Sequence, residues 1–194
     1  MTPLTAKLLH GLCMVAWWVI RRPFERKAKR NVIAHDAMDL REKALLSVSL
    51  AGLGVIPALY ITTGFPAAFD QPFSPLRAWA GLAVFIAALV LFRATHKALG
   101  RNWSVTLAVR QEHALVTTGV YRFVRHPMYS AFWLWAIAQA LTLQNWVAGL
   151  SGLIGFGTLY AFRVGREEAL MRATFGAAWD AYAARTPRVV PFLR

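Results

Sequence analysis

Five apolar runs, separated by polar stretches, constrain this chain more than any other feature of its sequence. They cover residues 4–20, 44–65, 76–92, 129–143 and 146–162. A helix needs about 20 apolar residues, or about 17 at the short limit, to cross a bilayer. The run 44–65 is long enough, whereas 4–20 contains Lys7 and His10 and 129–143 is short, so both need polar flanks that snorkel or extend the helix. The sequence therefore predicts an all-α protein with five transmembrane helices.

The composition also favours a membrane protein over a soluble domain. Of the 194 residues, 57% are hydrophobic and 16% are charged, and the mean hydropathy is +0.42. The formal net charge of +13 could indicate a nucleic-acid partner, but the basic residues gather at the ends of apolar runs rather than on a soluble module. We therefore interpret this charge as a signal of topology and of contact with anionic membrane lipids, and we expect no nucleic-acid partner.

Cysteine content and the N-terminal sequence limit the remaining possibilities. Cys13 is the single cysteine, so the chain has neither an intrachain disulfide nor a cysteine metal cluster. The N-terminus lacks a basic region followed by a small-residue cleavage site, so we expect no removable signal peptide. We treat residues 1–194 as one integral membrane domain.

The distribution of basic residues predicts an orientation. All of the 22 Lys and Arg residues except Lys7 and Arg77 fall on one side of the five predicted spans. The positive-inside rule then places the N-terminus outside and the C-terminus in the cytoplasm. Only Gln144 and Asn145 separate the last two runs, so these two helices should form a tight antiparallel hairpin.

Three glycines in the last run indicate close helix packing rather than chemistry. Gly149, Gly152 and Gly155 fall on successive turns of a helix. Small residues allow the backbones of membrane helices to approach closely. We expect this face to pack against Ala136 and Ala140 of the preceding run.

The chemistry should lie where polar residues meet the fourth apolar run. Residues 100–128 form a polar stretch that is too long for a simple connection, and long ordered loops are usually functional. Its end holds Tyr121, Arg125, His126 and Tyr129, at the depth where water gives way to lipid. Pro127 removes a backbone donor and biases His126 away from helix, so backbone groups in this turn are available to a ligand.

A second polar element leaves the fifth run on the same side of the membrane. On a continuing helix Arg163 and Glu167 are four residues apart and share one face, where a surface ion pair is the simplest interpretation. The predicted hairpin brings the start of the fourth run beside the end of the fifth. We therefore expect Arg125, His126 and Tyr129 to face Arg163 and Glu167 and to form one site.

The polar sequence motifs resemble those of a known family. The matching segments, in order and spacing, are Leu-Gly-Arg-Asn-Trp-Ser at 99–104, His-Ala-Leu-Val-Thr-Thr-Gly-Val-Tyr at 113–121, Arg-His-Pro-Met-Tyr at 125–129, Glu-Glu at 167–168 and Phe-Gly at 175–176. They resemble the isoprenylcysteine carboxyl methyltransferases, especially the short archaeal and bacterial members. The resemblance covers roughly residues 90–194. Related membrane methyltransferases that act on phospholipid amines and other small nucleophiles share the Arg-His-Pro-x-Tyr motif, so the motif identifies the cofactor more securely than the substrate.

The resemblance implies a cofactor, a site and a location. It implies S-adenosylmethionine bound by a cytoplasmic region made of residues 100–129 and 163–194, within a prokaryotic inner membrane protein. It implies that Arg163 contacts the carboxylate of a lipophilic acceptor. Thr106 stands where some members have a cofactor-contacting glutamine, and Ala131 replaces a small residue that is often glycine. The cofactor contacts that it implies are His113, Ala114, Leu115, Val116, Tyr121, His126, Pro127, Met128, Tyr129 and Glu167.

The residue types suit methyl transfer to a carboxylate. The sulfonium of the cofactor is already an activated leaving group, so the nucleophile needs to be held close and aligned, and no metal is required. A carboxylate is ionised near neutral pH and needs no general base, and an arginine can orient it, whereas an ammonium would be repelled. Two alternatives stay open: a phospholipid or small-molecule methyltransferase, and a non-enzymatic protein that binds lipid headgroups. A headgroup binder gains from basic residues but has no use for Glu167.

Overall fold

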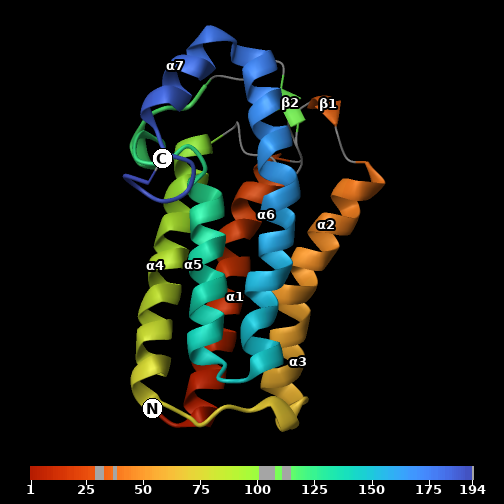
Figure 1. The fold of residues 1–194 in the computed structure, drawn as a ribbon, viewed down its shortest axis with the longest axis vertical. Coiled ribbons are helices and arrows are strands. Elements are labelled where there is room, and N and C mark those ends of the chain that lie inside the picture. Colours follow the sequence, from red (N-terminus) through yellow and green to blue (C-terminus); the bar gives the residue numbers. More distant parts are fainter. Residues whose placement is uncertain (29–32, 37–38, 101–107, 111–114, 194) are drawn as a thin grey trace.

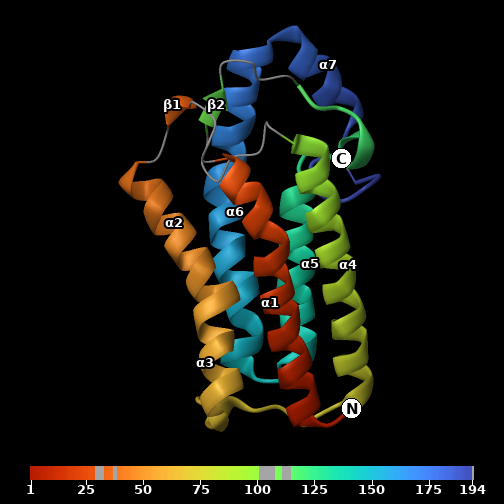
Figure 2. The ribbon, with the colours of Figure 1, turned by 180° about the vertical axis from the view of Figure 1, so that it is seen from behind.

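The protein is a bundle of long helices that run alternately up and down. The computed structural model describes residues 1–28, 33–36, 39–100, 108–110 and 115–193. Five helical passes stand side by side, with the N-terminus at one end of the bundle and the C-terminal segment at the other (Figures 1 and 2). The passes are α1 (Pro3–Ala28), α2 (Leu40–Leu50) continued by η1 (Ala51–Val55) and α3 (Ile56–Thr63), α4 (Pro75–Leu99), α5 (Pro127–Thr142) and α6 (Trp146–Phe175).

Four of the described helices are long and apolar enough to cross a membrane. These candidate spans are Pro3–Arg26, Leu40–Thr63, Pro75–Leu99 and Trp146–Phe175. The predicted fourth span corresponds to α5, which has 16 residues. At 1.5 Å per residue this helix is about 24 Å long, shorter than the roughly 30 Å hydrocarbon core. The helical membrane architecture is thus confirmed, whereas the fifth span stays a prediction.

The hairpin of the last two predicted spans is present and is fixed by its turn. Asn145 caps α6, because its side-chain oxygen accepts hydrogen bonds from the backbone nitrogens of Val147 and Ala148. Its amide nitrogen donates to Pro66 O and to Asp70 Oδ1, each at 2.8 Å. The turn therefore ties the α5–α6 hairpin to the loop between α3 and α4.

The sequence predicted that glycines of α6 pack against α5. This prediction is correct for Gly149 and wrong for Gly155. A side chain at Gly149 would meet α5, where the Cα of Ala140 lies 3.4 Å from the position of an added Cβ. A Cβ at Gly155 would instead lie 2.7 Å from Val48 O and 3.1 Å from the Cα of Gly52. The second pass, rather than α5, takes this close approach, because its own Gly52 presents bare backbone to α6.

The second pass contains an irregular turn that the sequence did not predict. The π-helical η1 follows α2, and Gly52 O within it accepts hydrogen bonds from Gln139 Nε2 at 3.0 Å and Ser151 Oγ at 2.8 Å. Irregular backbone at membrane depth is tolerated where protein groups satisfy it. Three passes of the bundle are therefore joined at one backbone carbonyl.

The opposite end of the bundle carries the polar elements. There α6 continues past the predicted end at residue 162 and leads into α7 (Ala177–Arg185). The 3-10 turn η4 (Gly119–Arg122) precedes α5, and the short strands β1 (Ile33–Asp36) and β2 (Ala108–Arg110) pair antiparallel. In Figure 1 these elements and the C-terminal segment gather above the helices.

Candidate functional site

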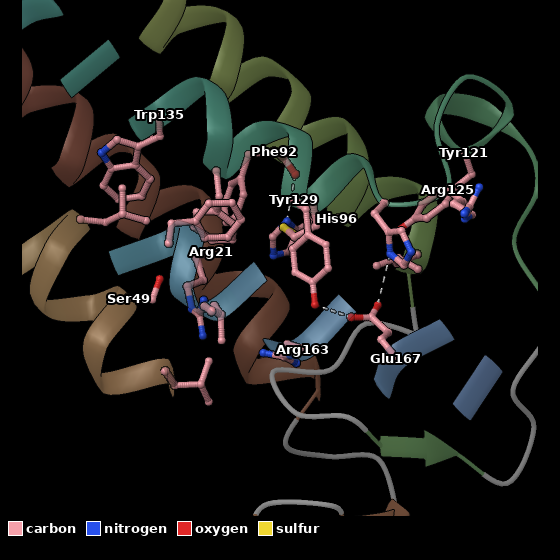
Figure 3. A pocket seen from close by; sticks show the side chains of 18 of the residues that line it. Arg21, Ser49, Phe92, His96, Tyr121, Arg125, Tyr129, Trp135, Arg163 and Glu167 are labelled. Atoms are coloured by element: carbon pink, nitrogen blue, oxygen red, sulfur yellow. Dashed lines mark hydrogen bonds and ion pairs between the residues drawn. The ribbon is translucent and has the colours of Figure 1, made fainter. Parts of the chain in front are cut away.

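A large cavity lies at the polar end of the bundle and extends between its helices. Its volume is about 850 Å³, within the range of about 300–1,000 Å³ typical of small-molecule sites. One part of its wall is aromatic and aliphatic, with Trp17 and Trp18 from α1, Leu53 from η1, Phe92 from α4 and Trp135 from α5. Figure 3 shows Trp135 and Phe92 on the opposite side of Tyr129 from Arg125 and Tyr121. The same cavity therefore joins an apolar region to a polar one.

The polar part is built by the first turn of α5 and the extension of α6. Tyr129 donates a hydrogen bond to Glu167 Oε2, and Nδ1 of His126 lies 3.7 Å from Oε1 of the same residue. His126 is 5% exposed, whereas the side chain of Glu167 is 29% exposed. The carboxylate of Glu167 is thus held from two sides, while part of the side chain stays exposed.

The charge state of His126 follows from its two acidic neighbours. Its Nε2 lies 3.0 Å from Glu168 Oε1. Burial alone would lower the pKa of His126, but the hydrogen bonds and negative charges of Glu167 and Glu168 outweigh it and raise the pKa above 6.5. The two carboxylates therefore stabilise the protonated imidazole, in which both ring nitrogens donate, more than water would.

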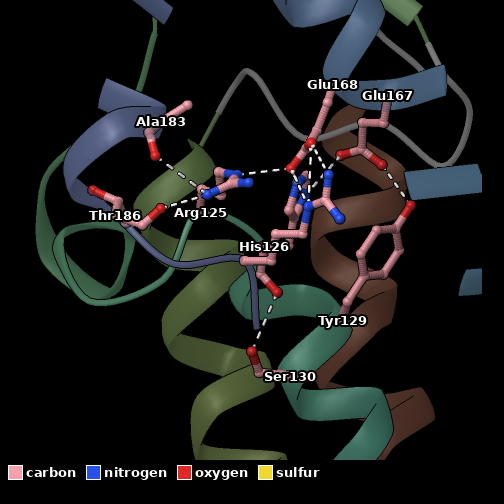
Figure 4. A network of polar contacts seen from close by, with 9 residues as sticks. Arg125, His126, Tyr129, Ser130, Glu167, Glu168, Ala183 and Thr186 are labelled. Carbon is pink, nitrogen blue, oxygen red and sulfur yellow. Dashed lines mark hydrogen bonds and ion pairs between the residues drawn. The ribbon is translucent and has the colours of Figure 1, made fainter. Parts of the chain in front are cut away.

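Glu168 links this turn to the C-terminal segment (Figure 4). Its Oε1 accepts from Arg125 Nε at 2.7 Å, and its Oε2 accepts from Arg188 Nη2 at 2.8 Å. Backbone nitrogens of Arg125 and His126 donate to the carbonyls of Pro187 and Arg188, each at 2.9 Å. The C-terminal segment is thereby laid against the start of α5, as the expectation of a site shared by the loop and the tail requires.

Burial also explains the state of Tyr121, which the sequence placed in the site. It is 9% exposed, and its backbone carbonyl accepts a hydrogen bond from Tyr182 of α7 at 2.7 Å. Burial, then the negative charge of Glu167 and the neighbouring Tyr182, raise the pKa of Tyr121 well above 10. The phenol therefore remains a neutral hydrogen-bond donor.

Arg163 lies in the cavity wall, but its acidic partner differs from the expected one. Its Nη1 lies 3.1 Å from Oε1 of Glu42, in the first turn of α2. The i, i+4 pairing with Glu167 was wrong, because the Glu167 carboxylate turns toward Tyr129 and His126 on α5. Arg163 is 8% exposed and Glu42 is fully buried, so this is an ion pair inside the bundle.

Most of the residues inferred from the sequence lie around this cavity. Pro127 begins α5 but is not among the lining residues, and His113, Ala114 and Thr106 lie outside the described residues. Within the described ranges, no group of three His, Cys, Asp or Glu side chains could hold a metal ion. The predicted residues that line the cavity are Leu115, Val116, Tyr121, Arg125, His126, Met128, Tyr129, Arg163 and Glu167.

Two parts of the site were missed from the sequence. Glu42 gave a weak signal, as an acid just before the apolar run 44–65, but nothing local indicates that it reaches Arg163. Trp179 and Tyr182 of α7 also line the cavity, and both are almost fully buried. Their signal was the presence of two large aromatics in the tail, a pattern typical of a docked helix.

Comparisons with known proteins agree with the motif resemblance. Residues 79–173 match the model of the isoprenylcysteine carboxyl methyltransferase family. Protein-S-isoprenylcysteine O-methyltransferase B of Arabidopsis thaliana is 32% identical over 115 residues, 58% of each chain. A probable protein-S-isoprenylcysteine O-methyltransferase of Oryza sativa subsp. indica is 29% identical over 167 residues, 85% of this chain and 84% of the relative. The match thus spans little more than half of the Arabidopsis protein.

A solved structure shares the fold. It is that of a eukaryotic intramembrane Ras methyltransferase, an isoprenylcysteine carboxyl methyltransferase, and it superposes with a TM-score of 0.52 at 20% identity. The superposition covers 80% of this chain and 53% of the solved one. At this identity the similarity establishes the helical membrane fold.

Proposed function

We propose that this chain is a membrane-embedded methyltransferase of the isoprenylcysteine carboxyl methyltransferase type and that it uses S-adenosylmethionine. The acceptor that we propose is the carboxylate of a lipophilic, isoprenylcysteine-like molecule drawn from the bilayer. The observation that carries this proposal is that one cavity of about 850 Å³ is lined both by Glu167 and Arg163 and by Trp17, Phe92 and Trp135. A soluble substrate would not need such an apolar extension, and a headgroup site would not need the carboxylate.

The polar part of the cavity fits the cofactor. S-adenosylmethionine, when bound, supplies a methyl group on a positively charged sulfur. Glu167 presents a carboxylate to a cation, and the face of Tyr129 and neighbouring aromatic rings can stabilise a sulfonium. Leu115 and Val116 add apolar wall. We therefore assign cofactor contacts to these residues, to Tyr121, His126 and Met128, and, as the resemblance implies, to Pro127, His113 and Ala114.

Arg163 has a separate role in the proposal. Its planar guanidinium can hold an acceptor carboxylate by two hydrogen bonds, which fixes the attacking oxygen. Because a carboxylate is ionised at neutral pH, none of the residues has to act as a general base. The buried aromatic wall keeps water away from the attacking carboxylate oxygen. A less hydrated carboxylate attacks the methyl group more readily. The product is a neutral ester.

The membrane placement is also part of the proposal. We propose that all five helical passes cross the membrane, with α5 completed by its flanking turns, and that the N-terminus is outside. The cavity then opens toward the cytoplasm, which is where the cofactor is made available. A prokaryotic inner membrane is the location that the motif resemblance suggests.

Binding of S-adenosylhomocysteine to the purified protein in detergent tests the cofactor. A ligand that binds only the folded protein stabilises it by mass action, so the unfolding temperature should rise. At a ligand concentration of 100 times Kd the free energy of unfolding should increase by about 2.7 kcal/mol. Glu167→Gln should weaken binding about tenfold or more, because a charge-assisted hydrogen bond is lost. Asp180→Asn, which removes an exposed carboxylate paired with Arg172 at the same end, should leave binding unchanged.

The acceptor is tested with a farnesylated cysteine derivative that carries a free carboxylate. The acid should be methylated, whereas the same compound as a carboxamide and a phospholipid amine should not. Methylation of the amine alone would refute the carboxyl acceptor and leave the methyltransferase. If S-adenosylhomocysteine neither binds nor stabilises the protein, the methyltransferase proposal itself fails and headgroup binding becomes the better explanation.

A further inference from the structure

Two acid–arginine pairs join the start of α2 to the extension of α6. Asp39 Oδ2 lies 3.0 Å from Arg166 Nη2, and Glu42 Oε1 lies 3.1 Å from Arg163 Nη1. Both acids and both arginines are three residues apart, so each pair lies one helical turn from the other. The Asp39–Arg166 pair is solvent-exposed, with side chains 50% and 34% exposed, whereas Glu42 is 0% and Arg163 10% exposed.

The inner pair places Arg163 between Glu42 and the cavity. Arg163 lines the cavity, but Glu42 is not among its lining residues. Within the part of the chain that the structure describes, neither carboxylate oxygen of Glu42 makes a hydrogen bond. A buried carboxylate with a charge partner but no hydrogen-bond donor is costly to maintain. The presence of such a carboxylate beside Arg163 points to a role for its charge.

We propose that Glu42 is the residue that sets the affinity of this site for acidic acceptors, by pairing with Arg163 in the place of the acceptor carboxylate. This inference rests on the function proposed above. When an acid approaches Arg163 from the cavity, it has to share the guanidinium with Glu42, and the two negative charges repel each other. After methylation the product is a neutral ester, which binds Arg163 less strongly, so Glu42 no longer has to share the guanidinium. Glu42 thereby moderates binding of the acid and favours release of the ester.

In the proposal Glu42 acts through Arg163. A test variant therefore has to remove the negative charge of Glu42 and keep the shape of its side chain. Glu42→Gln keeps the length of the side chain and an oxygen that can accept from Arg163, but it removes the competing negative charge. We expect the KM for the farnesylated cysteine acid to fall about tenfold. The inhibition constant of the matching carboxamide, which has no charge to repel, should stay unchanged. Because the bound acid is held more tightly, kcat should not rise.

The neighbouring pair supplies the matched control. Asp39→Asn removes a negative charge from the same turn of α2, and asparagine still caps the helix through the bond that Asp39 now makes to Glu42 N. This variant should leave the KM for the acid at its wild-type value. Glu42→Asp, which restores the charge, should return the KM toward wild type. A general loosening of α2 against α6 would shift the KM in the control as well.

A further pair of variants covers the case in which Glu42→Gln does not fold. Arg163→Gln leaves Glu42 as a lone charge, so this variant should bind the carboxamide better than the acid. Arg163→Gln combined with Glu42→Gln carries no buried charge at this position and should bind the two compounds alike. If the single Arg163→Gln variant shows no preference against the acid, the proposed role of Glu42 is wrong.

The outcomes separate the two proposals. If the wild-type protein methylates no acid at all, the proposed function fails, whatever Glu42 does. If the wild type methylates the acid but Glu42→Gln leaves the KM unchanged or raises it, only the role of Glu42 is overturned. A rise would mean that Glu42 supports Arg163 mechanically instead of competing with the acceptor.

Discussion

At the scale of single residues, the α5–α6 hairpin decides which polar side chains meet at the cavity. His126, Tyr129, Arg163 and Glu167 do lie around one cavity, because the α5–α6 hairpin places the start of one helix beside the end of the other. The predicted ion pair between Arg163 and Glu167 was wrong. The spacing of four residues favoured Glu167, but its carboxylate accepts a hydrogen bond from Tyr129 on α5 instead. Arg163 pairs with Glu42, which lies on α2 and is remote in sequence. Pairings of this kind depend on tertiary packing that no local pattern encodes.

Replacing Arg163 with lysine tests whether turnover depends on the planar guanidinium of Arg163 or only on its positive charge. Arg163→Lys keeps a positive charge beside Glu42 but loses the planar pair of donors. Turnover of the acid acceptor should fall about tenfold or more, since oriented hydrogen bonds to a charged group are lost. The affinity for S-adenosylhomocysteine, measured calorimetrically, should change little.

Arg166 provides the comparison for this variant. It lies one turn further along α6 and pairs with the exposed Asp39. Arg166→Lys should therefore leave turnover at the wild-type level, because surface pairs contribute little. Equal activity in both lysine variants would show that Arg163 acts as a general positive charge, or only anchors α2, and does not orient the acceptor.

At the scale of elements, hydropathy located the helices but misjudged their ends. The predicted run 146–162 continues to Phe175 as one helix, and the run 76–92 continues to Leu99. Polar residues do not stop these helices, because their side chains find partners at the polar end of the bundle, as Glu167 does with Tyr129 of α5 and Glu168 with His126. The apolar pattern marks where lipid ends, whereas the helix ends where its capping residues lie, at Gly100 and Gly176.

The π-helical turn η1 was not predictable because its cause is a contact between helices. A Cβ at Gly52 would overlap Ser151 O and lie 3.1 Å from the Cα of Gly155. Gly52→Ala should therefore destabilise the protein by about 1–3 kcal/mol, the usual cost of overpacking. The bonds from Gln139 and Ser151 to Gly52 O would also be strained. A lower unfolding temperature in detergent is the expected measurement.

Gly165 on α6 is the control for this substitution. A Cβ there would meet no atom within 4 Å. Gly165→Ala should leave the unfolding temperature unchanged or raise it, because alanine is favoured over glycine inside a helix by up to about 1 kcal/mol. A Gly52→Ala variant as stable as the Gly165→Ala variant would contradict the close packing of the second pass on α6.

At the scale of the whole molecule, the C-terminal segment lies at one end and the N-terminus at the other (Figures 1 and 2). The polar part of the cavity, which Tyr121, Trp179 and Tyr182 line, lies at the C-terminal end. The basic residues follow the same division. Lys7 lies in the first turns of α1 and Arg77 in the first turn of α4, both at the end away from the cavity. At that end Lys7 Nζ lies 3.9 Å from the centre of the Tyr60 ring. The fold and the distribution of basic residues therefore distinguish the same two ends of the bundle. Which end faces the cytoplasm has to be measured.

Single cysteines at the two ends measure this direction in intact cells. In a Cys13→Ala background, which removes the only native thiol, Phe69→Cys and Ala184→Cys place exposed thiols at opposite ends. If the positive end is cytoplasmic, a membrane-impermeant maleimide should label position 69 without permeabilisation and position 184 only after it. The opposite pattern would place the cavity on the outer face, where no cytoplasmic cofactor reaches it, and would overturn the proposed supply of S-adenosylmethionine along with the orientation.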